Sequence, residues 1–148
     1  MRMDPLMLIR LMDDEGFRAS KYKDTEGFWT IGYGHKLGAP KDPLHKLSPI
    51  SVRYAYDLLL KDIDIAESAL NQALPWALEL NETRYGVLVN MTFNLGIAGV
   101  KKFRKFLKAL KEGNYKEASE EMLKSKWAKQ VKERAVRLAR YMERGEIC

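Results

Sequence analysis

The sequence predicts an α+β protein, mainly α, in which a small β-hairpin lobe and a helical C-terminal lobe are joined by a long helix. Three observations support this prediction. Two short aromatic and β-branched runs between residues 20 and 35 flank a turn-forming segment. Apolar residues then recur at helical spacing from Val52 to Leu70. From about Asn81 to the end, the pattern is helical throughout.

The first expected element is a helix that begins after Asp4 and ends at Glu15. Asp4 is a suitable N-cap, Pro5 suits the first helical position, and Gly16 is typical of the position just past a helix end. One face carries Glu15 together with Leu8, Leu11 and Met12. The last turn of a helix carries partial negative charge, which disfavours a carboxylate and favours a carboxyl that keeps its proton. Glu15 is therefore a candidate general acid.

A β-hairpin follows, with strands expected over Ser20–Lys23 and Phe28–His35. The segment between them, Asp24-Thr25-Glu26-Gly27, has the composition of a turn. Turns are wet and rich in donors, so Asp24 is expected to stay ionised and to be able to activate a water molecule. The same aspartate also has a purely structural interpretation, because turn aspartates commonly bond their own backbone.

Strand alternation divides the second strand into two faces. Thr30 shares its face with Gly32 and Gly34, and such small residues are expected to let a bulky polymer approach the backbone closely. Thr30 would then help to hold the attacking water. The opposite face carries His35, together with Trp29, Ile31 and Tyr33. We expect His35 to form a structural ion pair with Asp62 rather than to act as a base.

The long helix is capped by Ser48 or Ser51 and ends before Pro75. Its apolar stripe consists of Val52, Ala55, Leu59, Ile63, Ala66 and Leu70. Roughly 20 residues span about 30 Å, enough to connect two lobes. We expect a single domain over 1–148, with the N-terminal helix and β lobe in 1–50, the connecting helix in 51–74 and the helical lobe in 75–148.

The helical lobe is expected to be divided at residues 81–83, 96–99 and 113–114 and at Ser125. Residues 101–111 form a strongly basic segment that predicts an amphipathic helix. One interpretation is an element that binds membranes or the cell envelope. The favoured interpretation is a core helix whose lysines face water and whose Phe103, Phe106, Leu107 and Leu110 point inward.

Composition limits the class of protein. The chain has 148 residues, 46% hydrophobic residues and one cysteine, Cys148, so a core is available and an intramolecular disulfide is impossible. We expect no metal and no cofactor. The net charge of +6 favours anionic cell-envelope polymers as partners, while the absence of nucleic-acid-binding motifs argues against specific nucleic-acid binding. Neither a secretory signal nor a transmembrane segment is recognisable, and a monomer is expected.

Several blocks resemble the phage-type lysozymes, or endolysins, a family of glycoside hydrolases. The catalytic signature of that family is similar to Asp-Glu-Gly-Phe-Arg at 14–18, Tyr-Lys-Asp-Thr-Glu-Gly at 22–27 and Trp-Thr-Ile-Gly-Tyr-Gly-His at 29–35. Its helical lobe is similar to Asn-Met-Thr-Phe-Asn-Leu-Gly at 90–96 and Lys-Ser-Lys-Trp at 124–127. The resemblance implies a lysozyme-like fold and spans nearly the whole chain.

The resemblance also implies an activity and roles for particular residues. The activity is hydrolysis of the β-1,4 bond between N-acetylmuramic acid and N-acetylglucosamine in bacterial peptidoglycan, with inversion and host-cell lysis. Glu15 would be the acid, Asp24 the base that activates water and Thr30 the residue that positions it. The residues alone leave inversion and retention open. Phe93 and Asn94 would bind substrate, although Asn94 also suits a helix-end cap, and Lys36 is a further candidate.

Two classes of function follow from these observations. The first is an active muramidase, and the second is a catalytically silent, basic cell-wall-binding module on the same scaffold. Retention of all three signature residues favours the enzyme. For an endolysin, the resemblance implies accumulation in the host cytoplasm before lysis and release through a separate membrane-permeabilising protein.

Overall fold

The computed structural model describes residues 1–38, 42–47 and 49–147. The chain forms two compact units, one of residues 9–65 and the other of residues 1–8 together with 66–148. The divisions fall inside two helices, α1 (Pro5–Glu15) and α2 (Val52–Ala73), so each of these helices contributes residues to both units. The smaller unit contains all the strands that the structure describes.

Helix α1 has the boundaries that its sequence predicts. The Asp4 carboxylate accepts a hydrogen bond from the N–H of Leu6 at 2.7 Å, which satisfies a donor of the first turn. The helix ends at Glu15, and Gly16 follows with φ of 68°, in the left-handed region that favours glycine. The N–H of Gly16 donates to the carbonyl of Met12 at 2.9 Å and closes the last turn.

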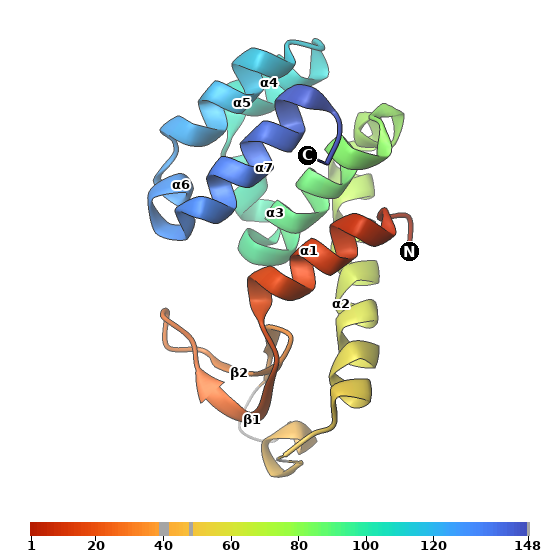
Figure 1. Ribbon diagram of the computed structural model, residues 1–148, viewed down its shortest axis with the longest axis vertical. Coiled ribbons are helices and arrows are strands. Elements are labelled where there is room, and N and C mark those ends of the chain that lie inside the picture. The colour runs from red at the N-terminus through yellow and green to blue at the C-terminus, as the bar shows by residue number, and fades with distance from the viewer. Residues whose placement is uncertain (39–41, 48, 148) are drawn as a thin grey trace. The chain divides into compact units, whose positions relative to one another are not determined.

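Three antiparallel strands follow, β1 (Arg18–Lys23), β2 (Trp29–Gly32) and β3 (His35–Lys36), in the order β1-β2-β3. Figure 1 shows β1 and β2 below α1. The expectation of one continuous strand over 28–35 is wrong. Gly32 and Gly34 have φ of 67° and 66°, and this left-handed geometry turns the chain at residues 33–34 and folds β3 back onto β2.

The strand register decides which side chains share a face of the sheet. Thr30 lies opposite Tyr22 on β1 and opposite Lys36 on β3. Residues directly opposite each other in antiparallel strands point to the same side, so these three side chains share one face. His35 lies opposite Ile31 and belongs to the other face.

Helix α2 is capped by Ser51, whose hydroxyl accepts a hydrogen bond from the N–H of Tyr54 at 3.0 Å. The alternative cap, Ser48, lies outside the described residues, as does Cys148. The predicted stripe is buried except at its first member, because Val52 is 55% exposed and the packed face begins at Ala55. A short 3₁₀ helix, η1 (Pro43–Lys46), precedes α2. Buried side chains of this unit include Leu11, Ile31, Ile50, Ala55, Leu59 and Ile63.

The larger unit is helical, and α7 packs against both α3 and α5. Its elements are η2 (Pro75–Glu79), α3 (Glu82–Lys101), α4 (Arg104–Lys111), α5 (Tyr115–Lys124), α6 (Lys126–Val131) and α7 (Glu133–Arg144). Asn81 and Ser125 cap α3 and α6, at two of the positions where the sequence predicts a division between helices. The core includes Leu88, Met91, Phe106, Leu110, Met122, Leu138 and Tyr141.

Two helix boundaries differ from the prediction. The basic segment 101–111 is not one helix, because Lys101 ends α3 and α4 begins only at Arg104. A second break separates α6 from α7 at Lys132, whose φ is 51°. Of the four side chains that the interpretation of a core helix places inward, Phe106 and Leu110 are buried, whereas Phe103 and Leu107 are half-buried.

The N-terminal residues are fixed to the helical unit through a buried carboxylate. Glu67 on α2 is 6% exposed and accepts hydrogen bonds from the backbone N–H groups of Arg2, at 2.9 and 3.0 Å, and of Met3, at 2.8 Å. Gly86 on α3 lies against Met7, because a Cβ at this glycine would be only 2.7 Å from the Met7 Cγ. Among the described residues, no helix is long and apolar enough to cross a membrane.

Candidate active site

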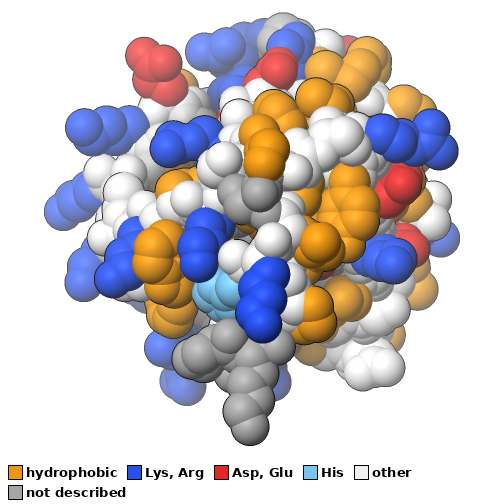
Figure 2. All heavy atoms as spheres, turned by 90° about the horizontal axis from the view of Figure 1, so that it is seen from below, with side chains coloured by type: hydrophobic (Ala, Val, Ile, Leu, Met, Phe, Trp, Pro, Cys, Tyr) orange, Lys and Arg blue, Asp and Glu red, His pale blue; other side chains and the backbone are white. Residues whose placement is uncertain are grey.

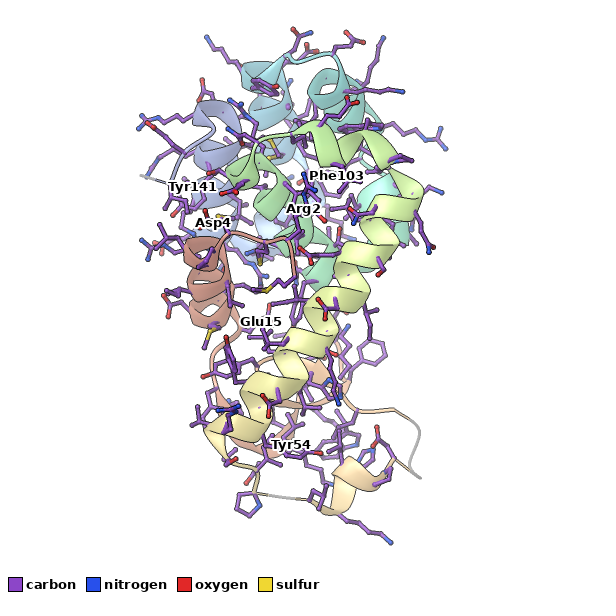
Figure 3. The ribbon with its side chains drawn as sticks, turned by 90° about the vertical axis from the view of Figure 1, so that its right-hand side faces the viewer. Arg2, Asp4, Glu15, Tyr54, Phe103 and Tyr141 are labelled. Carbon is purple, nitrogen blue, oxygen red and sulfur yellow. The ribbon has the colours of Figure 1, made fainter. Side chains whose placement is uncertain are left out.

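Glu15, labelled in Figure 3, is the last residue of α1. Its half-buried side chain lies against Gly34, in the turn between β2 and β3. A Cβ placed on Gly34 in that turn would collide with Oε1 of Glu15 and would lie 3.0 Å from its Cδ. The glycine therefore provides the space in which the carboxyl is seated. The helix end and the strand turn together fix the position of Glu15.

Asp24 occupies the turn between β1 and β2 and organises it. Its Oδ1 accepts hydrogen bonds from the N–H groups of Glu26 and Phe28, both at 2.9 Å. The structural role of a turn aspartate is therefore present. It uses only one carboxylate oxygen, since no hydrogen bond to Oδ2 is found among the described residues. Oδ2 can accept a proton while Oδ1 holds the side chain in place.

Thr30 is joined to Asp24 through the backbone of Phe28. The Phe28 carbonyl accepts both the N–H of Asp24, at 2.9 Å, and the hydroxyl of Thr30, at 3.0 Å. Because the hydroxyl proton is committed to this carbonyl, the lone pairs of the Thr30 Oγ1 are left to accept a hydrogen bond. Thr30 is only 3% exposed, so its rotamer is fixed by packing. One peptide thus sets the relative positions of a carboxylate and a hydroxyl acceptor.

The glycines beside Thr30 do not form an open surface for a polymer, contrary to the expectation from strand alternation. A Cβ on Gly32 would lie 3.1 Å from the Cβ of Ala55 on α2, and Gly34 lies against Glu15. Both glycines allow close packing within the smaller unit. The reason for the difference is the turn at residues 33–34, which ends the alternation on which the prediction depended.

Tyr22 is a residue that sequence reasoning did not select. It lies opposite Thr30 in the sheet, and the guanidinium carbon of Arg18 lies 4.4 Å from the centroid of its ring. Its pKa is raised above the ordinary value by partial burial first and then by the negative charge of Glu15, with a smaller contribution from Asp24; Arg18 acts in the opposite direction. The phenol therefore stays neutral and lies in the field of both candidate catalytic carboxyls. The sequence pattern that could have identified Tyr22 is the alternation of side chains along β1.

The structure brings His35 and Asp62 together. Nδ1 of the histidine lies 2.7 Å from Oδ2 of the aspartate, and both side chains are largely buried. The hydrogen bond that His35 donates to Asp62 raises the pKa of His35 more than burial lowers it, and the charges of Asp62 and Asp42 add to the increase. The protonated histidine is thus favoured in the folded protein.

Lys36, a predicted substrate-binding residue, lies on the same face of the sheet as Thr30. Its ammonium group lies 4.7 Å from the ring centroid of Phe28, whose side chain is 53% exposed. The cation and the aromatic ring form a small exposed surface beside the Asp24 turn. Such a pair can contact the hydroxyl groups and the apolar faces of a sugar.

Phe93 and Asn94 belong to the helical unit, on α3. Asn94 does not act as a helix-end cap, because its Oδ1 accepts the indole N–H of Trp127 at 2.7 Å. This bond joins the two blocks of the helical lobe on which the resemblance depends. Within the described part of the chain, no hydrogen bond from the Asn94 amide nitrogen is found, so its N–H groups can act as donors. A second bond of this kind joins Asn90 to Arg134, whose Nε and Nη2 donate to the Asn90 Oδ1 at 3.0 and 2.8 Å.

Trp127 also forms one wall of a pocket of about 670 Å³ in the helical unit. Phe103 packs edge-on against Phe106 and Trp127, with ring centroids 6.0 and 6.1 Å apart. Basic side chains at the rim are Lys102, Arg104, Lys105, Lys124 and Lys126. The aromatic residues of the basic segment thus pack against one another instead of forming an exposed apolar face, which favours the core interpretation over membrane insertion.

The described residues contain no group of three or more His, Cys, Asp or Glu side chains arranged to hold a metal ion. The chemistry that this part of the chain offers is that of a carboxyl at a helix end, a carboxylate in a turn and a hydroxyl fixed beside it. With the mainly helical α+β fold, these features are typical of the lysozyme-like glycoside hydrolases.

Comparison with known proteins gives the family. The Phage lysozyme family model matches residues 12–143, so the chain belongs to the phage lysozyme family and is a glycoside hydrolase with lysozyme activity. Family membership favours the enzyme over the catalytically silent binding module.

Individual relatives come from phages and from a eukaryote. Probable T4-type lysozyme 2 of Dictyostelium discoideum is 30% identical, over 90% of this chain and 91% of that protein. The Endolysin of Bacillus phage B103 is 32% identical, over 74% of this chain and 40% of its own. The Pre-baseplate central spike protein Gp5 of Enterobacteria phage T4 is 29% identical, over 93% of this chain but only 27% of that protein.

Proposed function

We propose that this lysozyme hydrolyses the β-1,4 bond between N-acetylmuramic acid and N-acetylglucosamine in bacterial peptidoglycan, with inversion at the anomeric carbon. The observation that carries the proposal is the link through Phe28, whose carbonyl fixes Asp24 and Thr30 around one peptide and leaves both able to accept a hydrogen bond. Two acceptors fixed in this way can orient a single water molecule.

Glu15 acts as the general acid in this mechanism. Its carboxyl donates a proton to the glycosidic oxygen as the bond to the anomeric carbon breaks, so the leaving sugar departs as a neutral alcohol. The close contact with Gly34 holds the carboxyl in one place, which limits the entropy lost in reaching the transition state.

Asp24 and Thr30 act on the nucleophile. A water molecule donates one hydrogen to Oδ2 of Asp24 and the other to Oγ1 of Thr30, and its lone pair is then directed at the anomeric carbon. As the new C–O bond forms, Asp24 takes the proton, while the proton of Glu15 has gone to the leaving oxygen. Attack from the face opposite the leaving group inverts the centre, and this arrangement requires roughly 6.5–9.5 Å between the carboxyls.

We assign substrate binding to Lys36, Phe93 and Asn94. Lys36 and the exposed ring of Phe28 suit a sugar beside the Asp24 turn. Asn94 can donate its amide hydrogens to an N-acetyl carbonyl, since Trp127 already fixes its oxygen. We assign His35 and Asp62 a structural role.

The positive charge favours anionic cell-envelope polymers as further partners. The net charge is +6, and Figure 2 shows Lys and Arg side chains over the face that it presents, with fewer Asp and Glu. The basic rim of the Trp127 pocket is one place where such groups can bind.

We propose a monomer without specific nucleic-acid binding. By analogy with the relatives named endolysins, it would accumulate in the host cytoplasm and lyse the host after release by a separate membrane-permeabilising protein.

Product analysis tests the bond and the stereochemistry. Purified peptidoglycan is digested, the new reducing ends are reduced with borohydride, and the sugar alcohols are identified by mass spectrometry. Muramitol at the new ends is expected, and glucosaminitol would contradict the proposed bond specificity.

Proton NMR early in the digestion should show the α-anomer first, whereas a β-anomer would show retention and exclude Asp24 as the base of an inverting reaction.

A further inference from the structure

Trp29 is an exposed aromatic residue on the side of the sheet opposite Thr30. It lies on β2 and is 39% exposed. Because side chains alternate along a strand, Trp29 points to the same side as Ile31, which is fully buried. The indole thus lies at the open end of a face that continues into the core of the smaller unit. Tryptophan is enriched at binding surfaces, so this ring is a candidate contact for a partner.

Two lysines of β1 place their ammonium groups around the Trp29 ring. Nζ of Lys21 lies 5.0 Å and Nζ of Lys23 lies 5.3 Å from the ring centroid, and Lys23 is directly opposite Trp29 in the sheet. Both distances are within the range of cation–π attraction. The two positive charges therefore lie within roughly one Debye length, about 10 Å, of each other and act together on an approaching anion.

These two charges are not neutralised by an ion pair. Among the described residues, neither ammonium group has a carboxylate within ion-pair distance. The indole attracts both cations although like charges repel each other. A bound anion would relieve that repulsion without breaking an existing ion pair.

The Trp29 ring is also held by His45, which lies on η1. The two rings meet edge to face, with centroids 6.5 Å apart. Asp42 fixes η1, because its two carboxylate oxygens accept the N–H groups of Gly38 and Leu44 at 2.9 and 3.0 Å. Contacts from both β1 and η1 therefore position the indole before any partner binds, which limits the entropy lost on binding.

We propose that Lys21, Lys23 and Trp29 form a docking surface for a polymer of polyol phosphates. This inference deepens the proposed association with anionic envelope polymers. Each ammonium group is a compact charge with three donors, which suits phosphate oxygens, and the exposed part of the indole can contact the carbon atoms of the polyol. Bound in this way, the enzyme would be held on the envelope through the side of the sheet that does not carry Thr30.

A lipid bilayer is the alternative anionic partner, and the docking surface suits it less. Binding at a bilayer surface requires a large apolar face that enters the boundary of the acyl chains. The apolar part of the docking surface is one indole, which already contacts two ammonium groups and a histidine. The charges therefore favour a polymer that is bound in water through its phosphates.

The test replaces both lysines with glutamine and measures binding of poly(glycerol phosphate) by isothermal titration calorimetry at low salt. We expect Lys21→Gln/Lys23→Gln to lower the affinity about thirtyfold, the combined effect of two cations near an array of anionic groups. Lys21→Arg/Lys23→Arg keeps both charges and should stay within about threefold of the wild type. Circular dichroism and urea unfolding check that the variants are folded.

Lys108→Gln/Lys111→Gln is the matched control. Both lysines are exposed on α4, and the double substitution lowers the net charge by the same amount. We expect an affinity within about threefold of the wild-type value. An equal loss in the two glutamine variants would show that binding depends on net charge, and it would overturn the docking surface.

Hydrolysis of polymer-free peptidoglycan separates this inference from the proposed function. If the wild type hydrolyses peptidoglycan but does not bind poly(glycerol phosphate), or binds it equally well without the two lysines, only the docking surface is overturned. If an inactive wild type binds the polymer through these lysines, the proposed hydrolysis fails and the docking surface stands. Tighter binding to vesicles of phosphatidylcholine and phosphatidylglycerol than to the polymer, lost in the same glutamine variant, would overturn the polymer as the partner.

Discussion

The position of the Glu15 carboxyl depends on the absence of a side chain at Gly34. Two independent features require glycine there, the φ of 66° and the contact with Glu15. A larger residue would strain the turn and also displace the Glu15 carboxyl from its position beside residue 34. The two effects can be separated by experiment, because only the second one alters catalysis.

We predict that Gly34→Ala lowers the rate of peptidoglycan hydrolysis by about tenfold or more, because Glu15 must move to admit the Cβ. The left-handed backbone should cost a further 1–2 kcal/mol, roughly, in the free energy of unfolding. Initial rates on purified peptidoglycan and urea unfolding curves measure the two quantities.

Gly113→Ala is the control for backbone strain. Gly113 has φ of 82°, and a Cβ there would have no neighbour within 4 Å. The control should lose similar stability and keep its full rate. Equal loss of activity in the two variants would show that strain, and not displacement of Glu15, explains the effect.

The contact of His35 with Asp62 predicts a pH-dependent stability. The folded protein raises the pKa of His35, so the contribution of the pair is fully present below the unfolded pKa of about 6.5 and fades as the pH rises through the folded value. Asp62→Asn should therefore lower the free energy of unfolding by roughly 1.5–3 kcal/mol at pH 5 and by progressively less up to pH 9. Urea unfolding across this range measures the difference.

The exposed pair of Arg53 and Asp57, on the same helix, provides the control. The distance from the Arg53 Nε to the Asp57 Oδ1 is 3.3 Å, and both side chains are mainly in water. Asp57→Asn should change stability far less and without pH dependence over the same range. Loss of activity in a stably folded Asp62→Asn variant would argue against a purely structural role for the His35 pair.

At the residue scale, the sequence could predict those site residues whose position in a helix, turn or strand is visible from their neighbours. Glu15 at a helix end, Asp24 in a turn and Thr30 in a strand each had a local signature. The link between the last two passes through the carbonyl of Phe28, and backbone atoms carry no residue-specific signal. Tyr22 had the right spacing but also suits any strand, so its environment became visible only in the structure.

Among the elements, the break between α6 and α7 is formed by Lys132, a residue type that does not favour the backbone conformation required there. Lys132 has φ of 51° and ψ of −113°, a conformation that side chains with a Cβ rarely adopt. We predict that Lys132→Gly raises the free energy of unfolding by about 0.5–1 kcal/mol, the relief of strain being partly offset by the greater entropy of the unfolded chain. Thermal and urea unfolding measure the gain.

Lys129→Gly is the comparison, because Lys129 lies inside α6. The same substitution in a regular helix should destabilise the protein by about 0.5–1 kcal/mol. If both variants lost stability, the conformation of Lys132 would not be strained.

Element boundaries could be predicted where a residue of known preference marks them. Asp4 and Ser51 cap helices as expected. Asn81 and Ser125 cap helices where divisions were expected, and Gly96 kinks α3 within the expected division at 96–99. The boundaries that were missed have other causes. The break at Lys132 was missed because no glycine or proline marks it. The end of α3 was missed because the basic pattern continues across it. The turn inside 28–35 was missed because it depends on two glycines, Gly32 and Gly34, which the alternation of side chains alone would assign to a strand.

For the whole molecule, the single domain over 1–148 remains a prediction. The division between the two units falls inside α1 and α2, so each helix has hydrogen-bonded turns on both sides of it. Loss of structure in one unit should therefore fray helices that the other unit needs. We predict one unfolding transition, with coincident curves for tryptophan fluorescence and far-ultraviolet circular dichroism. Two separated transitions would show independent domains.

The proposed mechanism requires Glu15 to supply the proton to the leaving sugar. The most direct measurement is the release of reducing ends from purified peptidoglycan by the wild type and by Glu15→Gln, with folding verified by circular dichroism. Glutamine keeps the size of the side chain but cannot act as the acid. We expect the rate to fall by about 10²–10⁴-fold or more, whereas a folded Glu15→Gln variant that hydrolyses peptidoglycan at the wild-type rate would contradict the role of Glu15 as the acid.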